Sequence, residues 1–180
     1  MYDNLFTAYE NNADIRIGDR VYNKAEYGEA VHITAENPSI SASYAAEGDA
    51  RIYFVDPDAN ATYDYSGNVY DMVIIGAESG TRSKLTINQQ IKLNKGGNNT
   101  YSGQFVVHNI DFDASSLTNY PLSQNWAGNF EYVMFDDCSI KCNSNGNRPL
   151  SYINAQRGFD DFNMIGCTYV STSETQNYII

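Results

Sequence analysis

The sequence predicts an all-β fold in which short strands stack as the coils of a right-handed parallel β-helix. Three observations favour it. The apolar residues, 42% of the 180, occur in short runs separated by Asn, Gly, Ser and Asp, which is typical of many short strands. Tyr is enriched at 15 residues, and long runs of good helix formers are missing. An eight-residue pattern also recurs in the second half of the chain.

Two regions follow in order along the chain. Residues 1–47 are expected to form an irregular N-terminal cap or attachment segment, and residues 48–180 to form the parallel β-helix domain. In the first region a short helix is expected at Asp3–Glu10, and alternating apolar runs occupy Ile15–Tyr22 and Ala30–Thr34. The first strands predicted for the second region are Arg51–Val55, Val69–Ile75, Leu85–Ile87 and Ile91–Leu93.

The recurring pattern is Phe105–Phe112, which is found again at Val133–Ile140 and at Phe162–Tyr169. Because a single copy cannot bury its own apolar face, the copies are expected to stack. Stacking aligns four apolar columns: Phe105/Val133/Phe162, Val107/Phe135/Met164, Ile110/Cys138/Cys167 and Phe112/Ile140/Tyr169.

Each copy consists of two short alternating strands separated by a one-residue bend. The bend falls on Asn109, Asp137 or Gly166, residue types that accept left-handed or turn geometry. A weaker copy is expected at Leu85–Ile87, about 25 residues before Ile110–Phe112. The bend is therefore predicted to recur in each coil.

Several segments resemble the coils of pectin-lyase-like β-helix proteins. The resemblance rests on Arg51–Pro57, Met72–Gly76 and His108–Phe112, and on the rung-like segments Phe135–Ile140 and Met164–Tyr169. It covers residues 48–172 and implies the right-handed parallel β-helix. That superfamily includes polysaccharide lyases, glycoside hydrolases, phage tailspikes, adhesins and secreted or surface repeat domains, so the resemblance implies a fold rather than one activity.

Charge and composition restrict the partners. The formal charge of −11 disfavours nucleic acid and other polyanions, so a neutral glycan or a protein is the expected partner. The chain contains no apolar stretch of about 18 residues, so membrane insertion is not expected, and its start lacks the features of a signal peptide. The fold resemblance nevertheless favours an extracellular, cell-surface or virion location.

Cysteine and histidine give no metal signature. The three cysteines and two histidines lack zinc-type spacing, and no resident cofactor is expected. Cys138 and Cys167 share one inward column, which predicts a cysteine ladder in the core, and an oxidising compartment would allow a disulfide between them. Cys142 would then stay unpaired. His32 and His108 are interpreted as surface residues.

Acidic residues of the repeats suggest glycosidase or calcium-site chemistry, since glycoside hydrolysis uses two carboxylates about 5–9.5 Å apart. The carboxylates concerned are Asp111, Asp113, Asp136, Asp137, Asp160 and Asp161. A β-helix lyase would instead use a basic residue near Ca²⁺, for which Arg148 and Arg157 in the connections are candidates. The Asn-Thr-Asp, Gly-His-Gly and Arg-Ile-Lys segments of polygalacturonase-like hydrolases are absent. Solvated or turn-capping acids and solvated basic residues remain the simpler interpretation.

Aromatic residues in the connections are the strongest binding signal, because sugar rings stack on aromatic faces. The predicted ligand-binding residues are Tyr120, Trp126, Tyr132 and Tyr152. The connection between Ala114 and Phe130 is the expected carrier, and packing of Trp126 on the flank is the alternative.

The last predicted coil ends near Tyr169, and nothing after it is long enough to cover a solenoid end. A C-terminal continuation, a partner protein or a homo-oligomer such as a trimer is therefore expected to cover it. The favoured function is a non-catalytic module for glycan binding or for a structural, adhesive role. The alternatives are a polysaccharide lyase or glycoside hydrolase using Asp136, Asp137, Arg148 or Arg157, and an oligomer with a purely architectural role.

Overall fold

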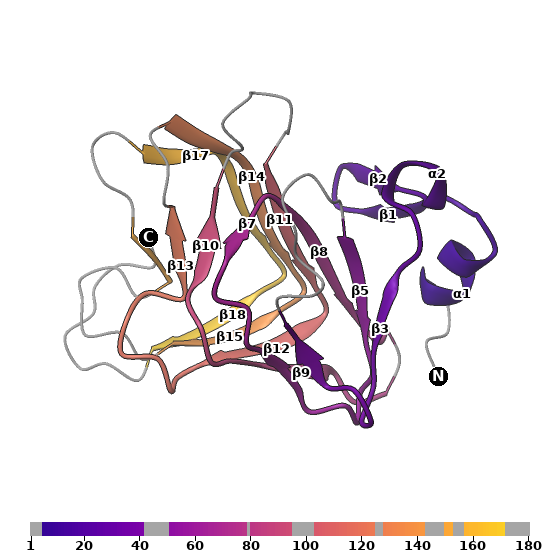
Figure 1. The fold of residues 1–180 in the computed structure, drawn as a ribbon, viewed down its shortest axis with the longest axis horizontal. Coiled ribbons are helices and arrows are strands. Elements are labelled where there is room, and N and C mark those ends of the chain that lie inside the picture. Colours follow the sequence, from indigo (N-terminus) through magenta and orange to yellow (C-terminus); the bar gives the residue numbers. More distant parts are fainter. Residues whose placement is uncertain are drawn as a thin grey trace.

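The protein consists mainly of short parallel strands in stacked sheets (Figure 1), which confirms the predicted all-β class. The structure is a computed structural model that describes residues 5–41, 51–78, 80–94, 103–124, 128–142, 150–152 and 157–171. Helices in these residues are limited to α1 (Leu5–Glu10) and α2 (Lys24–Tyr27).

Three parallel sheets contain most strands of the described residues. Sheet I has the order β3 (Val31–Ile33), β5 (Arg51–Val55), β8 (Asp71–Gly76), β11 (Gln104–His108), β14 (Gly128–Asp136) and β17 (Arg157–Ile165). Sheet II has the order β4 (Ser39–Ile40), β6 (Ala61–Tyr63), β9 (Ser83–Ile87), β12 (Ile110–Ala114), β15 (Ser139–Cys142) and β18 (Thr168–Ser171). Sheet III has the order β7 (Asn68–Val69), β10 (Ile91–Leu93), β13 (Leu122–Gln124) and β16 (Ser151–Tyr152).

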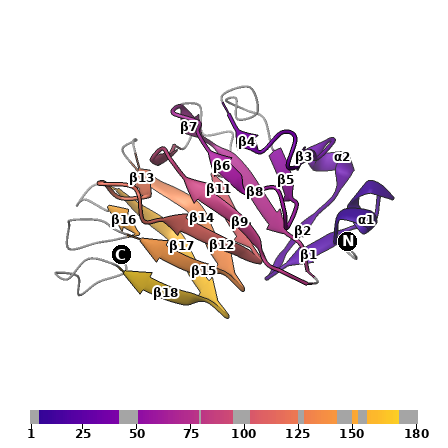
Figure 2. The same cartoon turned by 90° about the horizontal axis from the view of Figure 1, so that it is seen from below.

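From β3 onward, consecutive strands belong to different sheets. Strands β5, β6 and β7 lie in sheets I, II and III, and the next three triplets of strands repeat this assignment. Figure 2 shows the strands of each sheet side by side, with their order in space following the sequence colours. The run predicted at Val69–Ile75 is split at Tyr70, because the chain leaves sheet III there and enters sheet I.

Strand registers confirm the alignment of the repeated segments. Phe105 pairs with Val133, which pairs with Phe162. Val107, Phe135 and Met164 form the next column, and Phe112, Ile140 and Tyr169 form another. The cysteine column lies one residue before the paired part of β15 and β18. The sequence repeat therefore corresponds to real neighbours in the sheets.

The predicted bends are confirmed by the backbone. Asn109 and Asp137 have φ values of 52° and 51°, and Gly166 has 62°, so all three adopt the left-handed conformation. The backbone amide of Asn109 donates to Asp136 O at 2.9 Å, and that of Asp137 donates to Ile165 O at 2.8 Å. Hydrogen bonding between successive repeats thus continues through the corner that joins sheet I to sheet II.

The weaker copy at Leu85–Ile87 exists as part of β9, but its predicted register was wrong by two residues. Leu85 pairs with Phe112, whereas Ser83 pairs with Ile110. Ser83 can occupy this inward position because its hydroxyl donates to Val55 O at 2.6 Å and accepts from the Ala77 amide at 3.0 Å. A serine whose hydroxyl makes two hydrogen bonds therefore takes the place of an apolar residue in the column of Ile110.

The inward side chains of all three sheets form one continuous apolar core. Sheet I contributes Phe135, sheet II contributes Ile140 and sheet III contributes Leu93, each of them fully buried. In β17 and β18, Met164 and Tyr169 occupy the columns of Phe135 and Ile140 but are only partly buried. The inward side chains are therefore fully buried in the middle strands of the sheets and only partly buried in β17 and β18.

The first described residues pack on the outer face of sheet I and form a second apolar cluster there. This N-terminal segment, residues 5–29, contains α1, α2 and an antiparallel hairpin of β1 (Ile15–Ile17) and β2 (Arg20–Tyr22), and lies beside β3 and β5 in Figure 1. The hairpin turn needs a glycine, since Gly18 has a φ of 59° and a Cβ there would lie 2.7 Å from Met134 Sδ.

The sheets begin before the boundary at residues 47 and 48. Strand β3 pairs with β5, and β4 pairs with β6, both in parallel. Sheets I and II therefore extend into the region expected to be a cap, while the helices and the hairpin cover a flank of sheet I.

Candidate functional site

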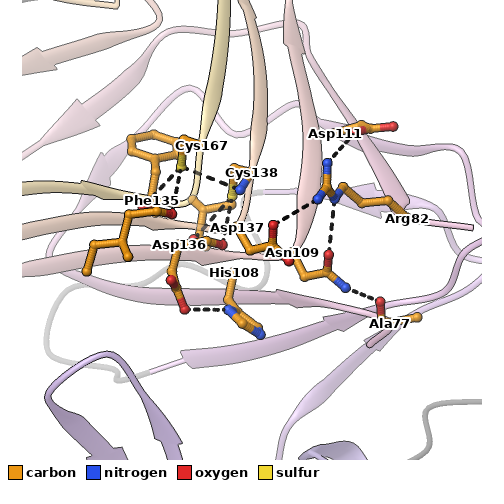
Figure 3. A network of polar contacts seen from close by, with 12 residues as sticks. Ala77, Arg82, His108, Asn109, Asp111, Phe135, Asp136, Asp137, Cys138 and Cys167 are labelled. Carbon is orange, nitrogen blue, oxygen red and sulfur yellow. Dashed lines mark hydrogen bonds and ion pairs between the residues drawn. The ribbon is translucent and has the colours of Figure 1, made fainter. Parts of the chain in front are cut away.

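A network of polar side chains lies at the corner between sheets I and II (Figure 3). Arg82, in the turn between β8 and β9, donates from Nε to Asn109 Oδ1 at 3.1 Å and from Nη2 to Asp137 Oδ1 at 3.0 Å. Its Nη1 lies 3.6 Å from Asp111 Oδ1. One guanidinium therefore links three successive turns between sheets I and II, using the directional donors that distinguish arginine from lysine.

The left-handed bend places its residues within reach of Arg82. Asn109 also donates from Nδ2 to the carbonyl of Ala77. Its own carbonyl lies so close to Gly76 that no Cβ could fit there. A short polar residue after β11 and a glycine at the end of the neighbouring strand β8 therefore form this corner together.

We expect Arg82→Ala to lower the free energy of unfolding by about 1–2 kcal/mol, because charged hydrogen bonds at partly exposed sites contribute about this much. Urea denaturation at low salt measures the loss, which should shrink at high salt. Lys84→Ala is the control, since Lys84 is exposed and only two residues away. Equal stability of the two variants would contradict a stabilising role for Arg82.

Asp136 lies on the other side of this corner, on the outer face of sheet I. Its Oδ2 is 2.8 Å from Nδ1 of His108, its register partner on β11, and the two side chains are 20% and 16% exposed. The histidine is thus paired rather than an isolated surface residue. A carboxylate bonded to Nδ1 orients an imidazole, an arrangement that serves a general base when a substrate proton lies near Nε2.

The four predicted catalytic residues are therefore not seen as one cluster. Asp136 contacts His108, and Asp137 contacts Arg82. Arg157 begins β17, but its side chain lies outside the described residues, as does all of Arg148. Asp160 and Asp161 are exposed on β17.

A shallow depression of about 250 Å³ lies on the outer face of sheet II, next to the corner network. Its polar lining forms two rows across β9, β12 and β15, as the strand registers show. The rows are Lys84, Asp111, Ser139 and Thr86, Asp113, Lys141. Asp111 also contacts Arg82, so the depression and the network share a carboxylate.

The formal charges of the side chains that line the depression sum to zero. Lys141 Nζ lies 3.6 Å from Asp113 Oδ2, and Ser115 donates to Asp113 Oδ1 from its hydroxyl and its amide. Burial alone would raise the pKa of Asp113, but the Ser115 hydrogen bonds and Lys141 outweigh it and lower that pKa. Two lysines, two aspartates and two hydroxyls thus present both donors and acceptors, with formal charges that sum to zero.

The predicted aromatic residues lie elsewhere, as far as their side chains are described. Tyr120 is half-buried before β13, and its carbonyl accepts from Gln90 Nε2 at 2.8 Å. Tyr132 is 3% exposed and donates to Asp19 Oδ1 at 2.7 Å, while the Arg20 guanidinium lies 4.0 Å from its ring centre. Burial raises the pKa of Tyr132 to about 12. Trp126 and the side chain of Tyr152 lie outside the described residues.

Reading the sequence alone missed Arg82 and Lys84 as site residues. Arg82 stands 27 and 55 residues from its two hydrogen-bond partners, so spacing gave no signal. The residues that line the depression could have been found from the sequence. They are polar and occupy every second, outward position of three aligned strands.

The comparisons with known proteins give no relatives: no protein-family model, curated protein or solved structure matches this chain. In the described residues, no group of three or more His, Cys, Asp or Glu side chains is close enough to hold a metal ion. Among the same residues, no helix is both long and apolar enough to cross a membrane.

Proposed function

We propose that this chain is a non-catalytic right-handed parallel β-helix module that binds an uncharged or zwitterionic glycan on the outer face of sheet II. The β-helix assignment is supported by the cyclic order of strands among three parallel sheets that share one core. Glycan binding is supported by one observation above all, the two rows of alternating lysine, aspartate and hydroxyl side chains in the depression.

The chemistry of these rows suits sugar hydroxyls, which both donate and accept hydrogen bonds. Neighbouring strands stand about 4.8 Å apart, so each row offers polar groups at a regular spacing along the stack. Lys84 is exposed to such a ligand, whereas Lys141 and Asp113 already form an ion pair with each other. The total charge of −11 would repel a polyanionic chain, which favours uncharged or zwitterionic sugars.

The absence of catalysis is part of the proposal and has its own support. The carboxylates of Asp136 and Asp137 point to different partners, His108 and Arg82, instead of facing a common substrate position. Lyase or hydrolase activity is the alternative, and Ca²⁺ would be its cofactor in the lyase form. A cell surface or virion is the location that we propose for such a binding module.

Binding can be tested with an array of neutral, zwitterionic and uronate-containing oligosaccharides, followed by calorimetry on those that bind. We expect Lys84→Ala with Lys141→Ala to weaken binding at least about tenfold, because hydrogen bonds to charged groups contribute roughly 1.5–3 kcal/mol each. The matched control is Lys92→Ala on sheet III, whose Nζ donates to Ser66 O at 2.8 Å.

Three results would contradict the proposal. Binding that is equally strong in the double lysine variant would place the ligand elsewhere. Strong preference for polyuronates would contradict the charge argument. New reducing or unsaturated sugar ends that disappear in Asp136→Asn or Asp137→Asn would establish the enzymatic alternative.

A further inference from the structure

Cys138 and Cys167 lie next to each other at the corner between sheets I and II, on successive coils (Figure 3). Cys138 Sγ is 3.4 Å from Val107 O, and Cys167 Sγ is 3.2 Å from Phe135 O. Val107 and Phe135 are register partners, so the two thiols occupy equivalent places one strand spacing, about 4.8 Å, apart. This spacing lies within the Cα separations at which disulfides form.

The two thiols differ in access and environment. Cys138 is 1% exposed, whereas Cys167 is half-buried because β17 and β18 are the last strands of their sheets in the described residues. The backbone amide of Cys138 donates to Cys167 Sγ at 3.4 Å, and such a donor stabilises a thiolate. Hydrogen bonding from the side chain and the amide of Cys138 lowers the pKa of Cys167.

Cys142 provides an internal reference, because it is also a thiol but has a different environment. It is fully buried at the end of β15, in line with Ser171 rather than with another cysteine. Burial raises the pKa of Cys142 to about 12. Its thiol should therefore react slowly while the chain stays folded.

We propose that Cys167 and Cys138 form an oxidation site that is modified by peroxides, with Cys167 reacting first and Cys138 resolving the product. The Cys167 thiolate attacks one peroxide oxygen, the O–O bond breaks, and hydroxide leaves as Cys167 becomes a sulfenic acid. The Cys138 sulfur then attacks the Cys167 sulfur, the S–O bond breaks, and water leaves with the Cys138 proton. With hydrogen peroxide, two thiols are oxidised to one disulfide, and the peroxide is reduced to two waters.

The position of the pair gives this oxidation a structural effect. Cys167 lies in the corner between β17 and β18, whose inward residues are the least buried of the core. A disulfide to Cys138 would bond this last coil covalently to the coil before it. Local opening of β17 and β18 should then become slower in the oxidised protein.

The test uses the full chain, reduced and then treated with hydrogen peroxide, and mass spectrometry of its peptides. We expect an intramolecular Cys138–Cys167 disulfide in the unmodified sequence and in Cys142→Ser. Cys138→Ala should stop at a Cys167 sulfenic acid that dimedone captures, and Cys167→Ser should form no disulfide. In a separate measurement on the untreated chain, iodoacetamide should label Cys167 at least about tenfold faster than Cys142.

Each opposite result would overturn the proposal. A disulfide that includes Cys142, or disulfides only between chains, would show that the pair is not the favoured site. Iodoacetamide labelling of Cys167 no faster than of Cys142 would show that Cys167 is not activated, and this measurement does not depend on whether any variant folds.

Discussion

Asp71→Asn is expected to raise the free energy of unfolding at pH 8 by about 2–4 kcal/mol, and to have little effect at pH 4. Asp71 lies on β8 at the contact between sheet I and the N-terminal segment. Burial raises its pKa to about 7, more than a hydrogen bond from Gln104 lowers it. In the unfolded chain the Asp71 carboxyl keeps its ordinary pKa of about 3.8. The difference between the folded and unfolded pKa values corresponds to roughly 4 kcal/mol of folding free energy.

The direction of the pH effect follows from the bound protons. Between about pH 4 and pH 7 the folded chain holds a proton on Asp71 that the unfolded chain has lost, so stability falls as the pH rises through this range. Above pH 7 an ionised carboxylate remains buried, with Oδ1 lacking a hydrogen-bond partner among the described side chains. An uncharged asparagine removes the free-energy cost of burying this charge.

Urea denaturation at several pH values measures the effect. Asp161→Asn is the matched control, because Asp161 continues the same outward row through Gln104 and Tyr132 but is exposed on β17. The control should leave the pH profile unchanged. Equal stability of Asp71→Asn and the unmodified chain at pH 8 would mean that Asp71 is not held in a low-dielectric site.

Phe135→Ala is expected to lower the free energy of unfolding by about 3–5 kcal/mol, the usual cost of emptying a phenylalanine site in a core. Phe135 is fully buried, and its ring centre lies 6.1 Å from that of Phe105, 5.4 Å from that of Phe112 and 6.4 Å from that of Phe162. The substitution therefore removes ring contacts with both neighbouring repeats, the one before Phe135 and the one after it.

Phe159→Ala is the comparison, since Phe159 is only partly buried in the last coil and its described ring contact is with Phe162 at 5.4 Å. Phe159→Ala should lower the free energy of unfolding by about half as much as Phe135→Ala does. If Phe135→Ala does not fold, Phe135→Leu provides the same ranking at a smaller cost. A smaller loss at residue 135 than at residue 159 would contradict the placement of the core.

The part of the fold that could be predicted from the sequence is the part that repeats. Phe105, Val133 and Phe162 fall in one column because the same pattern of apolar residues occurs three times. The residue types at the bends also indicate left-handed geometry, which the backbone adopts. The predicted register of Leu85 was wrong because Ser83 occupies an apolar column, where Val55 O and the Ala77 amide satisfy its hydroxyl.

The candidate site was harder to predict, because its contacts join residues that are far apart in the sequence. Strands such as β4 and β7 contain two residues each, too few for any periodic pattern. Arg82 contacts Asp137 only because the repeat that contains β11 and β12 lies between the β8–β9 turn and the corner that joins β14 to β15. The aromatic residues predicted to bind a ligand included Tyr132, but its side chain contacts Arg20 and Asp19 of the same chain. The depression is instead lined by lysines, aspartates and hydroxyl groups.

The tight corner at Asn109, Asp137 and Gly166 has a consequence for how such a chain can be altered. Only one or two residues separate β11 from β12, β14 from β15 and β17 from β18, whereas seven separate β12 from β13. Alignment between coils is fixed at the tight corner, so the longer connections can change length without shifting it. New peptide segments could therefore be grafted between Ala114 and Leu122, whereas a single insertion at Asn109 would displace every column that follows.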